Sequence, residues 1–297
     1  MIAVNNKNNC PVCGALWDDH EFGVPHPYCP QAPLPGKSWR YPDKNMKNTA
    51  NEIVQWIKDY ANKANRKSLV VGVSGGVDSA LVSTLCAMTG LHTHCVLMPC
   101  QTKPDQTDRG ALHLKWLRSK FDYVYSYQID LTDTFESFEN EILGLPHSPL
   151  GAANTKSRLR MVTLYRVATA FDGLVVGTGN KVEDFGVGFF TKYGDGGVDI
   201  SPIGDLLKSE VRQMCRELGV LPELSEAVPT DGLWTDTRTD EDQIGATYDE
   251  LEWAMSYTGD GFGLSHRQRN VLEIYNKWHT AGAHKLAPIP VFVRKTS

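Results

Sequence analysis

Short apolar runs alternate with longer amphipathic stretches from about residue 44 to residue 279. Strands are predicted where the runs are short and continuous, at 68–74, 92–98, 123–129 and 174–177. Helices are predicted where apolar residues recur every three or four positions, at about 53–64, 77–88, 105–120, 133–143, 153–171, 206–218, 240–257 and 266–279. Strands that alternate with such helices form a parallel sheet, because parallel neighbours need long crossover connections. We therefore expect an α/β fold in which a parallel twisted sheet carries helices on both faces.

The first 42 residues have a different texture, so we divide the chain into an extension, 1–42, and a main domain, 43–297. The extension is rich in proline, holds three of the seven cysteines and has almost no apolar periodicity. Such a segment buries too little surface to offset its ordering entropy unless something cross-links it. A C-x₂-C…H-x₂-C pattern predicts a zinc-knuckle-like site, and the alternative is three free cysteines in a flexible tail. The zinc ligands would be Cys10, Cys13, His26 and Cys29, with His20 as an alternative to His26.

The composition, 41% hydrophobic and 22% charged with a net charge of −5, is that of a soluble globular protein. No run approaches the ~18 apolar residues that a membrane span requires, and the first residues lack the features of a secretory signal. The mild acidity argues against a protein that coats nucleic acid by bulk charge. The cysteines after residue 42 stand singly in apolar contexts, so we expect reduced thiols and a cytoplasmic location.

The strongest local signal is the hexapeptide SGGVDS, residues 74–79, which follows one predicted strand and precedes a predicted helix. Glycines let the backbone turn sharply and approach an anion closely, and the N–H groups of a helix start favour phosphate. Asp78 adds a carboxylate beside that phosphate, which indicates a divalent cation such as Mg²⁺ between them. The pattern is neither the Walker loop nor the dinucleotide fingerprint. The alternative is an ordinary strand-to-helix turn capped by Ser74 or Asp78.

Residues 151–170 carry four cations, Lys156, Arg158, Arg160 and Arg166, and no acid. On an acidic protein this helix would offer a local surface that attracts anions, although such a face can also be merely solvated. Arg158 and Arg160 lie about 200° apart around a helix, so we do not expect both to face one ligand.

The SGGVDS hexapeptide resembles the pyrophosphatase loop of the N-type ATP pyrophosphatases, enzymes that adenylate a substrate oxygen and then let nitrogen or sulfur displace AMP. Further segments, in order along the chain, resemble ammonia-dependent NAD synthetase. These are RLRM (158–161), GTGNKVE (177–183), FFTKYGDGGVD (189–199), PIGDLLK (202–208), PT (229–230), DE (240–241) followed by Tyr248, and HK (284–285). The resemblance runs from about residue 45 to residue 293 and implies an adenine-nucleotide α-hydrolase-like sheet.

The resemblance also implies roles for individual residues. The ATP-binding residues would be Gly72, Val73, Ser74, Gly75, Gly76, Val77, Asp78, Ser79, Thr178, Lys208 and Thr230. The residues that bind deamido-NAD⁺ would be Arg158, Lys192, Asp199, His284 and Lys285. Asp78 and Glu183 would bind Mg²⁺, and with Lys208 they would form the catalytic group. Thr178 and Glu183 follow a predicted buried strand, at the sheet edge where open α/β folds bind ligands.

The reaction implied is the amidation of deamido-NAD⁺ by ammonia, with ATP cleaved to AMP and pyrophosphate through a deamido-NAD adenylate. We expect free ammonia as the nitrogen source because the chain is too short for an appended glutaminase domain. The resemblance implies a homodimer with sites near its interface, whereas nothing indicates a membrane or nucleic-acid partner. The alternatives are another adenylating amidotransferase or thiolase of the superfamily, acting on a nucleobase or tRNA, and a nucleotide-binding module without catalysis.

Several of these residues also have simpler interpretations. Lys208 could be a surface lysine on an amphipathic helix, and Asp195 and Asp199 could merely shape a glycine-rich turn. His284 and Lys285 are expected in a loop. The segments 185–199 and 225–239 look like loops that could cover the site, since a reactive adenylate must be kept from water. The interval between Glu183 and Phe189 is one residue longer than the resemblance implies.

Overall fold

The computed structural model describes residues 45–230, 232–234 and 238–294. At its centre lies a four-stranded parallel sheet in the order β3-β2-β1-β4. The strands are β1 (Ser68–Val73), β2 (His92–Leu97), β3 (Val124–Gln128) and β4 (Gly173–Val176). The predicted parallel α/β sheet is therefore confirmed, with each strand within two residues of its expected bounds. The candidate zinc ligands Cys10, Cys13, His26 and Cys29, together with His20, lie outside the described residues.

The strand order creates a crevice at one edge of the sheet. From the central β1 the chain passes outward to β2 and β3 and then returns to β4 on the other side of β1. The connections that leave the carboxyl ends of β1 and β4 therefore diverge to opposite sides of the sheet, and open α/β folds bind ligands in the gap that this leaves. Both the SGGVDS loop and the GTGNKVE segment begin at this gap.

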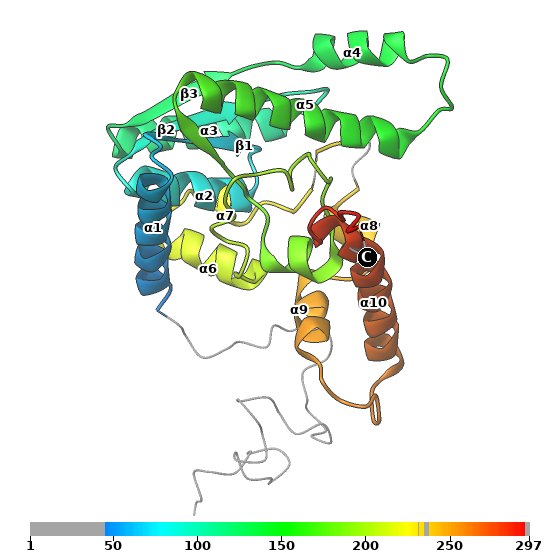
Figure 1. Cartoon of the computed structure of the whole chain (residues 1–297). Coiled ribbons are helices and arrows are strands. Elements are labelled where there is room, and N and C mark those ends of the chain that lie inside the picture. Colours follow the sequence, from blue (N-terminus) through cyan, green and yellow to red (C-terminus); the bar gives the residue numbers. More distant parts are fainter. Residues whose placement is uncertain (1–44, 231, 235–237, 295–297) are drawn as a thin grey trace, which may run out of the picture.

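Helices cover both faces of the sheet, as Figure 1 shows. The helices are α1 (Met46–Lys63), α2 (Val77–Met88), α3 (Pro104–Lys120), α4 (Thr132–Glu141), α5 (Pro149–Ala170), α6 (Lys208–Glu217), α7 (Pro222–Ser225), α8 (Asp240–Ile244), α9 (Tyr248–Ser256), α10 (His266–Leu286) and the π-helix η3 (Lys181–Val187). Helices α4 and α5 lie on one face, and α1, α2 and α6 lie on the other.

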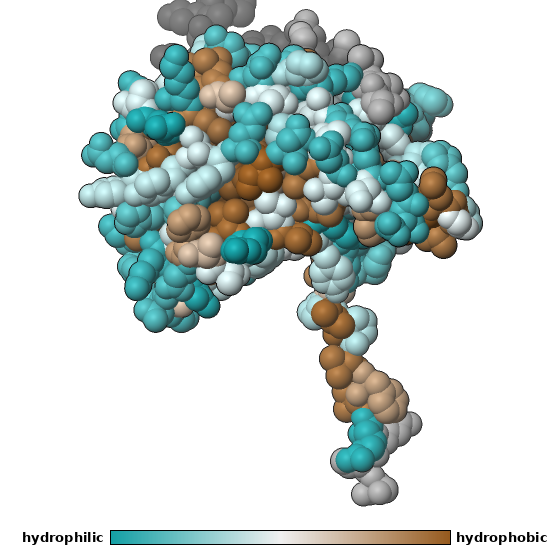
Figure 2. All heavy atoms as spheres, turned by 90° about the horizontal axis from the view of Figure 1, so that it is seen from above, coloured by the Kyte–Doolittle hydropathy of each residue, from teal (hydrophilic) through white to brown (hydrophobic). Residues whose placement is uncertain are grey.

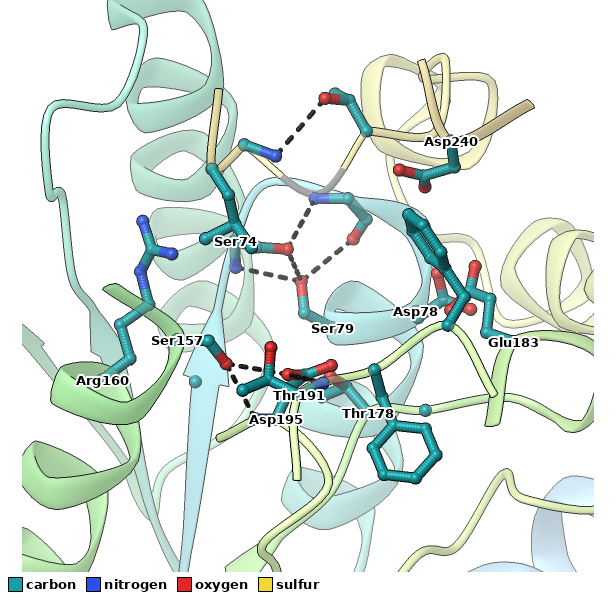
Figure 3. A pocket seen from close by; sticks show the side chains of 18 of the residues that line it. Ser74, Asp78, Ser79, Ser157, Arg160, Thr178, Glu183, Thr191, Asp195 and Asp240 are labelled. Carbon is teal, nitrogen blue, oxygen red and sulfur yellow. Dashed lines mark hydrogen bonds between the residues drawn. The ribbon is translucent and has the colours of Figure 1, made fainter. Parts of the chain in front are cut away.

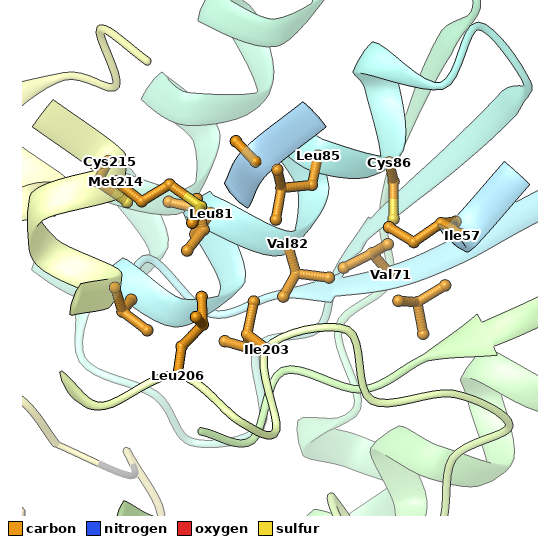
Figure 4. Packing of buried hydrophobic residues seen from close by; sticks show 14 of the residues in the cluster. Ile57, Val71, Leu81, Val82, Leu85, Cys86, Ile203, Leu206, Met214 and Cys215 are labelled. Atoms are coloured by element: carbon orange, nitrogen blue, oxygen red, sulfur yellow. The ribbon is translucent and has the colours of Figure 1, made fainter. Parts of the chain in front are cut away.

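Alternating side chains of β1 bind the two helical layers to the sheet. Leu69 and Val71 pack into the cluster formed with α1, α2 and α6, part of which is drawn in Figure 4. Val70 points the other way, into a cluster with Met161 and Leu164 of α5. All three strand side chains are 0% exposed, and burial of each such aliphatic side chain stabilises the fold by about 1.5–3 kcal/mol. The central strand, and with it the loop that follows, is therefore held rigidly from both faces.

A second helical unit lies beside the sheet. Val182 of η3, Leu251 of α9 and Val271 of α10 belong to one buried cluster of their own. The predicted helix 240–257 is wrong in one respect: it consists of two helices, because Gly245 adopts a left-handed conformation with φ of 92° and ends α8. Thr247 then starts α9 with a capping box.

The π-helix η3 follows β4 and contains Glu183. A π-helix closes i→i+5 hydrogen bonds, is rare, and is frequently found at functional sites. Here Gly188, with φ of 65°, ends the turn, and the Phe189 N–H donates to the Glu183 carbonyl at 2.8 Å. The start of the segment 185–199, which sequence analysis expected as a loop, is therefore helical as far as Val187.

Two global properties follow from the described part of the chain. None of its helices combines the length and the apolar character needed to cross a membrane. Its cysteines, Cys86, Cys95, Cys100 and Cys215, are all buried free thiols.

His113 of α3 is a fully buried histidine that helps to hold α2. The Ser83 hydroxyl donates to the Ser79 carbonyl at 2.7 Å, so His113 Nε2, 2.8 Å from Ser83 Oγ, is the protonated ring nitrogen. Nδ1 is buried without a hydrogen-bond partner among the residues described. Burial therefore lowers the pKa of His113 to about 4.

The pKa of His113 predicts an acid-sensitive fold. In the unfolded chain His113 takes up a proton below a pKa of about 6.5, whereas in the folded chain it does so only near pH 4. The free energy of unfolding should therefore fall by about 3 kcal/mol as the pH is lowered from 6.5 to 4. Urea unfolding across this range should show that loss in the wild type and should show less of it in His113→Gln, whose amide can still donate to Ser83. His147→Gln, at an exposed position before α5, should behave as the wild type. Equal pH dependence in His113→Gln and the wild type would refute this assignment.

Candidate active site

One large cavity of about 770 Å³ lies at the crevice between β1 and β4. Its walls come from the β1–α2 loop, the segment after β4, the first half of α5, residues 227–230 and 232–234, and the end of α10. Figure 3 shows several of these side chains directed toward one another from different elements. The cavity therefore joins parts of the chain that are far apart in sequence.

The loop after β1 forms a compact turn at the start of α2. The Ser79 hydroxyl lies 3.0 Å from the Gly76 carbonyl and accepts a hydrogen bond from the Ser74 N–H at 3.1 Å. Gly75 has φ of 82°, and any Cβ there would collide with the Gln106 carbonyl of α3. Glycine is therefore required at this position, where the loop packs against α3. The turn presents the N-terminus of a twelve-residue helix to the cavity, which favours a phosphate there.

All but one of the predicted ATP-binding residues of the loop after β1 line the cavity: Gly72, Val73, Ser74, Gly76, Val77, Asp78 and Ser79. Gly75 is not part of this lining, because it faces α3. Thr178 and Thr230, the other predicted ATP contacts, border the same cavity.

A buried ion triad lies at the base of the cavity. Lys208, the first residue of α6, is 2% exposed, and its Nζ lies 2.5 Å from Asp78 Oδ2 and 2.8 Å from Glu183 Oε1. The alternative that Lys208 is a surface lysine is therefore wrong. The three residues come from the starts of α2, η3 and α6, so the triad joins three segments that begin beside the carboxyl edge of the sheet.

The triad favours the charged forms of Lys208 and Glu183, whereas burial, which outweighs the charge of Lys208, raises the pKa of Asp78 above its usual value. Burial alone would lower the pKa of Lys208, but the charges of Asp78 and Glu183 and their hydrogen bonds raise that pKa above the usual lysine value. Burial likewise opposes ionisation of Glu183. The charge of Lys208, with hydrogen bonds from Lys208 and Tyr248, nevertheless holds the pKa of Glu183 below its usual value. When both carboxylates are ionised, the ammonium and the two carboxylates carry one net negative charge.

Two residues that sequence analysis gave no role position the triad. The Tyr248 hydroxyl donates to Glu183 Oε1 at 2.5 Å, and the Tyr248 ring lies 4.8 Å from Lys208 Nζ. Asn180 donates from Nδ2 to Asp78 Oδ1 at 3.0 Å, and its Oδ1 accepts the N–H groups of Val182 and Glu183. Asn180 could have been noticed as a polar side chain directly after a strand. Tyr248 is brought to the site only by tertiary packing.

The basic side chains predicted to bind deamido-NAD⁺ gather on another wall of the cavity. Arg158, Lys192, His284 and Lys285 all line it. Arg158 Nε donates to the Lys192 carbonyl at 3.2 Å, and Lys192 Nζ donates to the His284 carbonyl at 3.3 Å. Lys285 Nζ donates to the carbonyls of Gly188 and Phe190. The expected loop at His284 and Lys285 is wrong, because α10 continues to Leu286.

The last turns of α10 reach the cavity because the helix lies very close to η3. At the contact, a Cβ on Gly188 would come within 2.8 Å of the Gly282 Cα, and one on Gly282 within 2.9 Å of the Gly188 Cα. Two glycines facing each other permit this approach, so the backbone of α10 lies directly against the end of the π-helix. His284 and Lys285 follow within one turn of the contact.

Arg158 and Arg160 both border the cavity, but Arg158 bonds to the Lys192 carbonyl and Arg160 to a different segment. The expectation that they do not both face one ligand stays a prediction. The cavity is wide enough for two long side chains to reach it, and Arg160 Nε donates to the Met98 carbonyl at 3.1 Å on the β2 side. Asp199 lies outside the lining: its carboxylate accepts the Val175 N–H at 2.8 Å and the Tyr165 hydroxyl at 3.0 Å. Its role as a ligand stays a prediction. Arg166 is exposed on the surface of α5.

Two further acids complete the wall between the triad and the cations. Asp195 accepts the Ser157 hydroxyl at 2.7 Å and the Thr191 N–H at 2.9 Å, so it both shapes the glycine-rich turn and lines the cavity. Asp184 also lines the cavity, beside Gly179. Burial raises the pKa of both carboxyl groups.

The described residues suit a magnesium ion that a substrate helps to bind. No group of three or more His, Cys, Asp and Glu side chains in them could hold a metal. The oxygens of Asp78 and Glu183 do, however, converge on one cationic atom, Lys208 Nζ, which stands where a cation would. Mg²⁺ is commonly bound by one or two carboxylates together with substrate phosphates. The donor set therefore fits Mg²⁺ when a triphosphate supplies the remaining ligands.

Comparison with known proteins agrees with this geometry. The profile of the family described as NAD synthase matches residues 49–282. The chain is 37% identical over 221 residues to the NH(3)-dependent NAD(+) synthetase of Carboxydothermus hydrogenoformans, covering 73% of this chain and 88% of that protein. The fold is similar to that of an NMN synthetase from Francisella tularensis, with a TM-score of 0.74, 32% identity, and coverage of 84% of this chain and 100% of the other. It is also similar to an NH3-dependent NAD synthetase from Campylobacter jejuni, with a TM-score of 0.69, 21% identity and the same coverage.

The buried triad predicts a large stability loss in Lys208→Met. Removal of the ammonium leaves two buried carboxylates without their counterion, which should lower the free energy of unfolding by about 3–5 kcal/mol at pH 7.5. Lys181→Met is the matched control, because the Lys181–Asp205 pair is solvent-exposed and should contribute no more than about 1 kcal/mol. Urea unfolding of the two variants measures the difference, and equal losses in both would contradict a buried triad.

Proposed function

The chain belongs to the NAD synthase family, and we propose that it catalyses the ATP-dependent amidation of deamido-NAD⁺ by ammonia. The products would be NAD⁺, AMP and pyrophosphate, formed through a deamido-NAD adenylate. The single observation that supports this most strongly is the shared cavity. It joins a phosphate-binding helix start to a cluster of four basic side chains, so two anionic substrates could lie side by side.

The chemistry proposed rests on positioning and charge. A nicotinate carboxylate is a weak nucleophile, and the α-phosphate that it attacks is already anionic. The N–H groups at the start of α2 and the ammonium of Lys208 would bind and screen the phosphates, while Arg158 and Lys192 would hold the second substrate. Ammonia then displaces AMP from the adenylated carboxyl. Neither step requires a covalent bond to the protein.

Asp78 and Glu183 would hold Mg²⁺ against the triphosphate. The ion would supply charge neutralisation at the phosphates and stabilise pyrophosphate as it leaves. Asn180 and Tyr248 would keep the two carboxylates directed at one point, which is the geometry observed here without the ion.

A second candidate substrate is nicotinate mononucleotide, which lacks the AMP half of deamido-NAD⁺. The similarity to an NMN synthetase, at 32% identity over the whole of that protein, favours it specifically. Both substrates present the same carboxylate to the same activated phosphate. The part of the cavity around Arg158, Lys192 and His284 would bind the mononucleotide half that they share.

We also propose a homodimer that covers α4 and α5. Figure 2 looks onto these helices and shows apolar side chains at several places on their face. Leu143 and Leu145, between the helices, are 78% and 65% exposed, and Leu150 of α5 is both 61% exposed and part of the cavity lining. A partner on this face would therefore border the cavity. A one-chain mass in analytical ultracentrifugation would rule the dimer out.

We also propose a cytoplasmic location, with which the buried free thiols are consistent.

The N-terminal extension is proposed to bind one structural Zn²⁺ through Cys10, Cys13, His26 and Cys29. Three thiolates and an imidazole suit tetrahedral zinc, and the metal would cross-link a proline-rich segment. Metal analysis of the purified protein should give one zinc per chain, and Cys10→Ser should lose it. His20→Ala should retain the metal if His26 is the fourth ligand, whereas loss in His20→Ala alone would exchange the two roles. A wild-type protein free of zinc would refute the site.

The function is tested by incubating the protein with ATP, Mg²⁺, ammonium and each deamidated nucleotide in turn. NAD⁺ formation supports the first proposal, and a higher kcat/KM with nicotinate mononucleotide supports the second. AMP and pyrophosphate formed only with another acceptor would indicate a different superfamily member, and ATP binding without turnover a non-catalytic module. Asp78→Asn should lower kcat at least 100-fold, because it removes one of the two carboxylates proposed to hold Mg²⁺ against the phosphates. Full turnover in this variant would exclude Asp78 from the site.

A further inference from the structure

The ammonium of Lys208 occupies the point on which Asp78 and Glu183 converge. We propose that in the nucleotide-free protein Lys208 is the resident counterion of these carboxylates and excludes divalent cations, which bind there only when a triphosphate draws Lys208 away. This inference deepens the proposed function, because it describes how the same site is kept before its substrates arrive.

The geometry leaves little room for two cations. Lys208 Nζ lies 2.5 Å from Asp78 Oδ2 and 2.8 Å from Glu183 Oε1, so it uses one oxygen of each carboxylate. The second oxygen of Asp78 is engaged as well, since it accepts a hydrogen bond from Asn180 at 3.0 Å. Mg²⁺ needs oxygens at about 2.0–2.1 Å in near-octahedral order and would have to take the place of the ammonium.

Charge balance points the same way. With Lys208 in place, the two carboxylates carry one uncompensated negative charge, and a divalent ion would leave a net positive charge in a site where Lys208 is 2% exposed. A triphosphate reverses this, because its oxygens accept both the metal and the displaced ammonium. Metal and triphosphate should therefore bind with positive coupling, each raising the affinity for the other.

The surroundings of Lys208 hold it in place without a ligand. The ring of Tyr248 lies 4.8 Å from Nζ and offers a favourable face to a cation, while the Tyr248 hydroxyl fixes Glu183. Lys208 also begins α6, whose Val211 and Met214 are 0% exposed in the main core. The side chain can thus change partners at its tip while its backbone stays fixed.

The test uses the metal alone, with no nucleotide. Mn²⁺, detected by the loss of its free electron paramagnetic resonance signal, is titrated into the full-length wild type, Lys208→Gln and Lys181→Met. We expect Lys208→Gln to bind one Mn²⁺ per chain at the Asp78 site, at least tenfold more tightly than the wild type does at that site. Binding at the Asp78 site is identified as the part of the Mn²⁺ binding that Asp78→Asn removes. Lys181→Met should match the wild type. The double variant Asp78→Asn with Lys208→Gln should lose the gained site.

A second measurement keeps the test decisive if Lys208→Gln is poorly folded. Millimolar Mg²⁺ should raise the melting temperature of this variant by several degrees and leave that of the nucleotide-free wild type within a degree. Equal Mn²⁺ affinity in wild type and variant, with equal Mg²⁺ effects on melting, would overturn the inference. Absence of NAD⁺ and NMN formation would refute the proposed function but would not alter these nucleotide-free results, so the two failures are distinguishable.

Discussion

The contact between Lys208 and its two carboxylates is the interaction on which the site depends. It joins the starts of α2, η3 and α6. Asp78 and Glu183, which it brings together, are separated by more than 100 residues of chain. None of these side chains could be buried alone, since an isolated charge in the interior is strongly unfavourable. Each is stable there because of the others, so removal of one member leaves the remaining charges unpaired and destabilises the fold.

The rest of the architecture places groups that suit anionic ligands around this triad. Parallel strands deliver two loops to one edge of the sheet, and the strand order separates them enough to form a cavity. One wall offers the N–H groups of a helix start, another offers cations from α5 and α10, and acids lie between them. This sequence of charges along one cavity matches a reaction in which a carboxylate must approach a phosphate.

Sequence reasoning predicted the local features well. The strands and the SGGVDS turn are signalled by continuous apolar runs and glycines, which act within a few residues. It could not predict the π-helix, because one additional residue in a turn leaves no periodic trace, and it joined α8 to α9 across Gly245. The buried state of Lys208 and the positioning roles of Tyr248 and Asn180 depend on contacts between distant segments. The role of Asp199 as a ligand, which the resemblance implies, stays a prediction: in the structure its carboxylate accepts the Val175 N–H of β4.

The close approach of Gly188 and Gly282 has a consequence for how the helical unit beside the sheet can vary. The contact fixes the position of the last turn of α10, which carries His284 and Lys285. A single methyl group at either glycine would push the two backbones apart and move the last turn of α10 away from Arg158 and Lys192. The width of the cavity at the end of α10 is therefore set by the two glycines at this contact, of which Gly188 also lines the cavity.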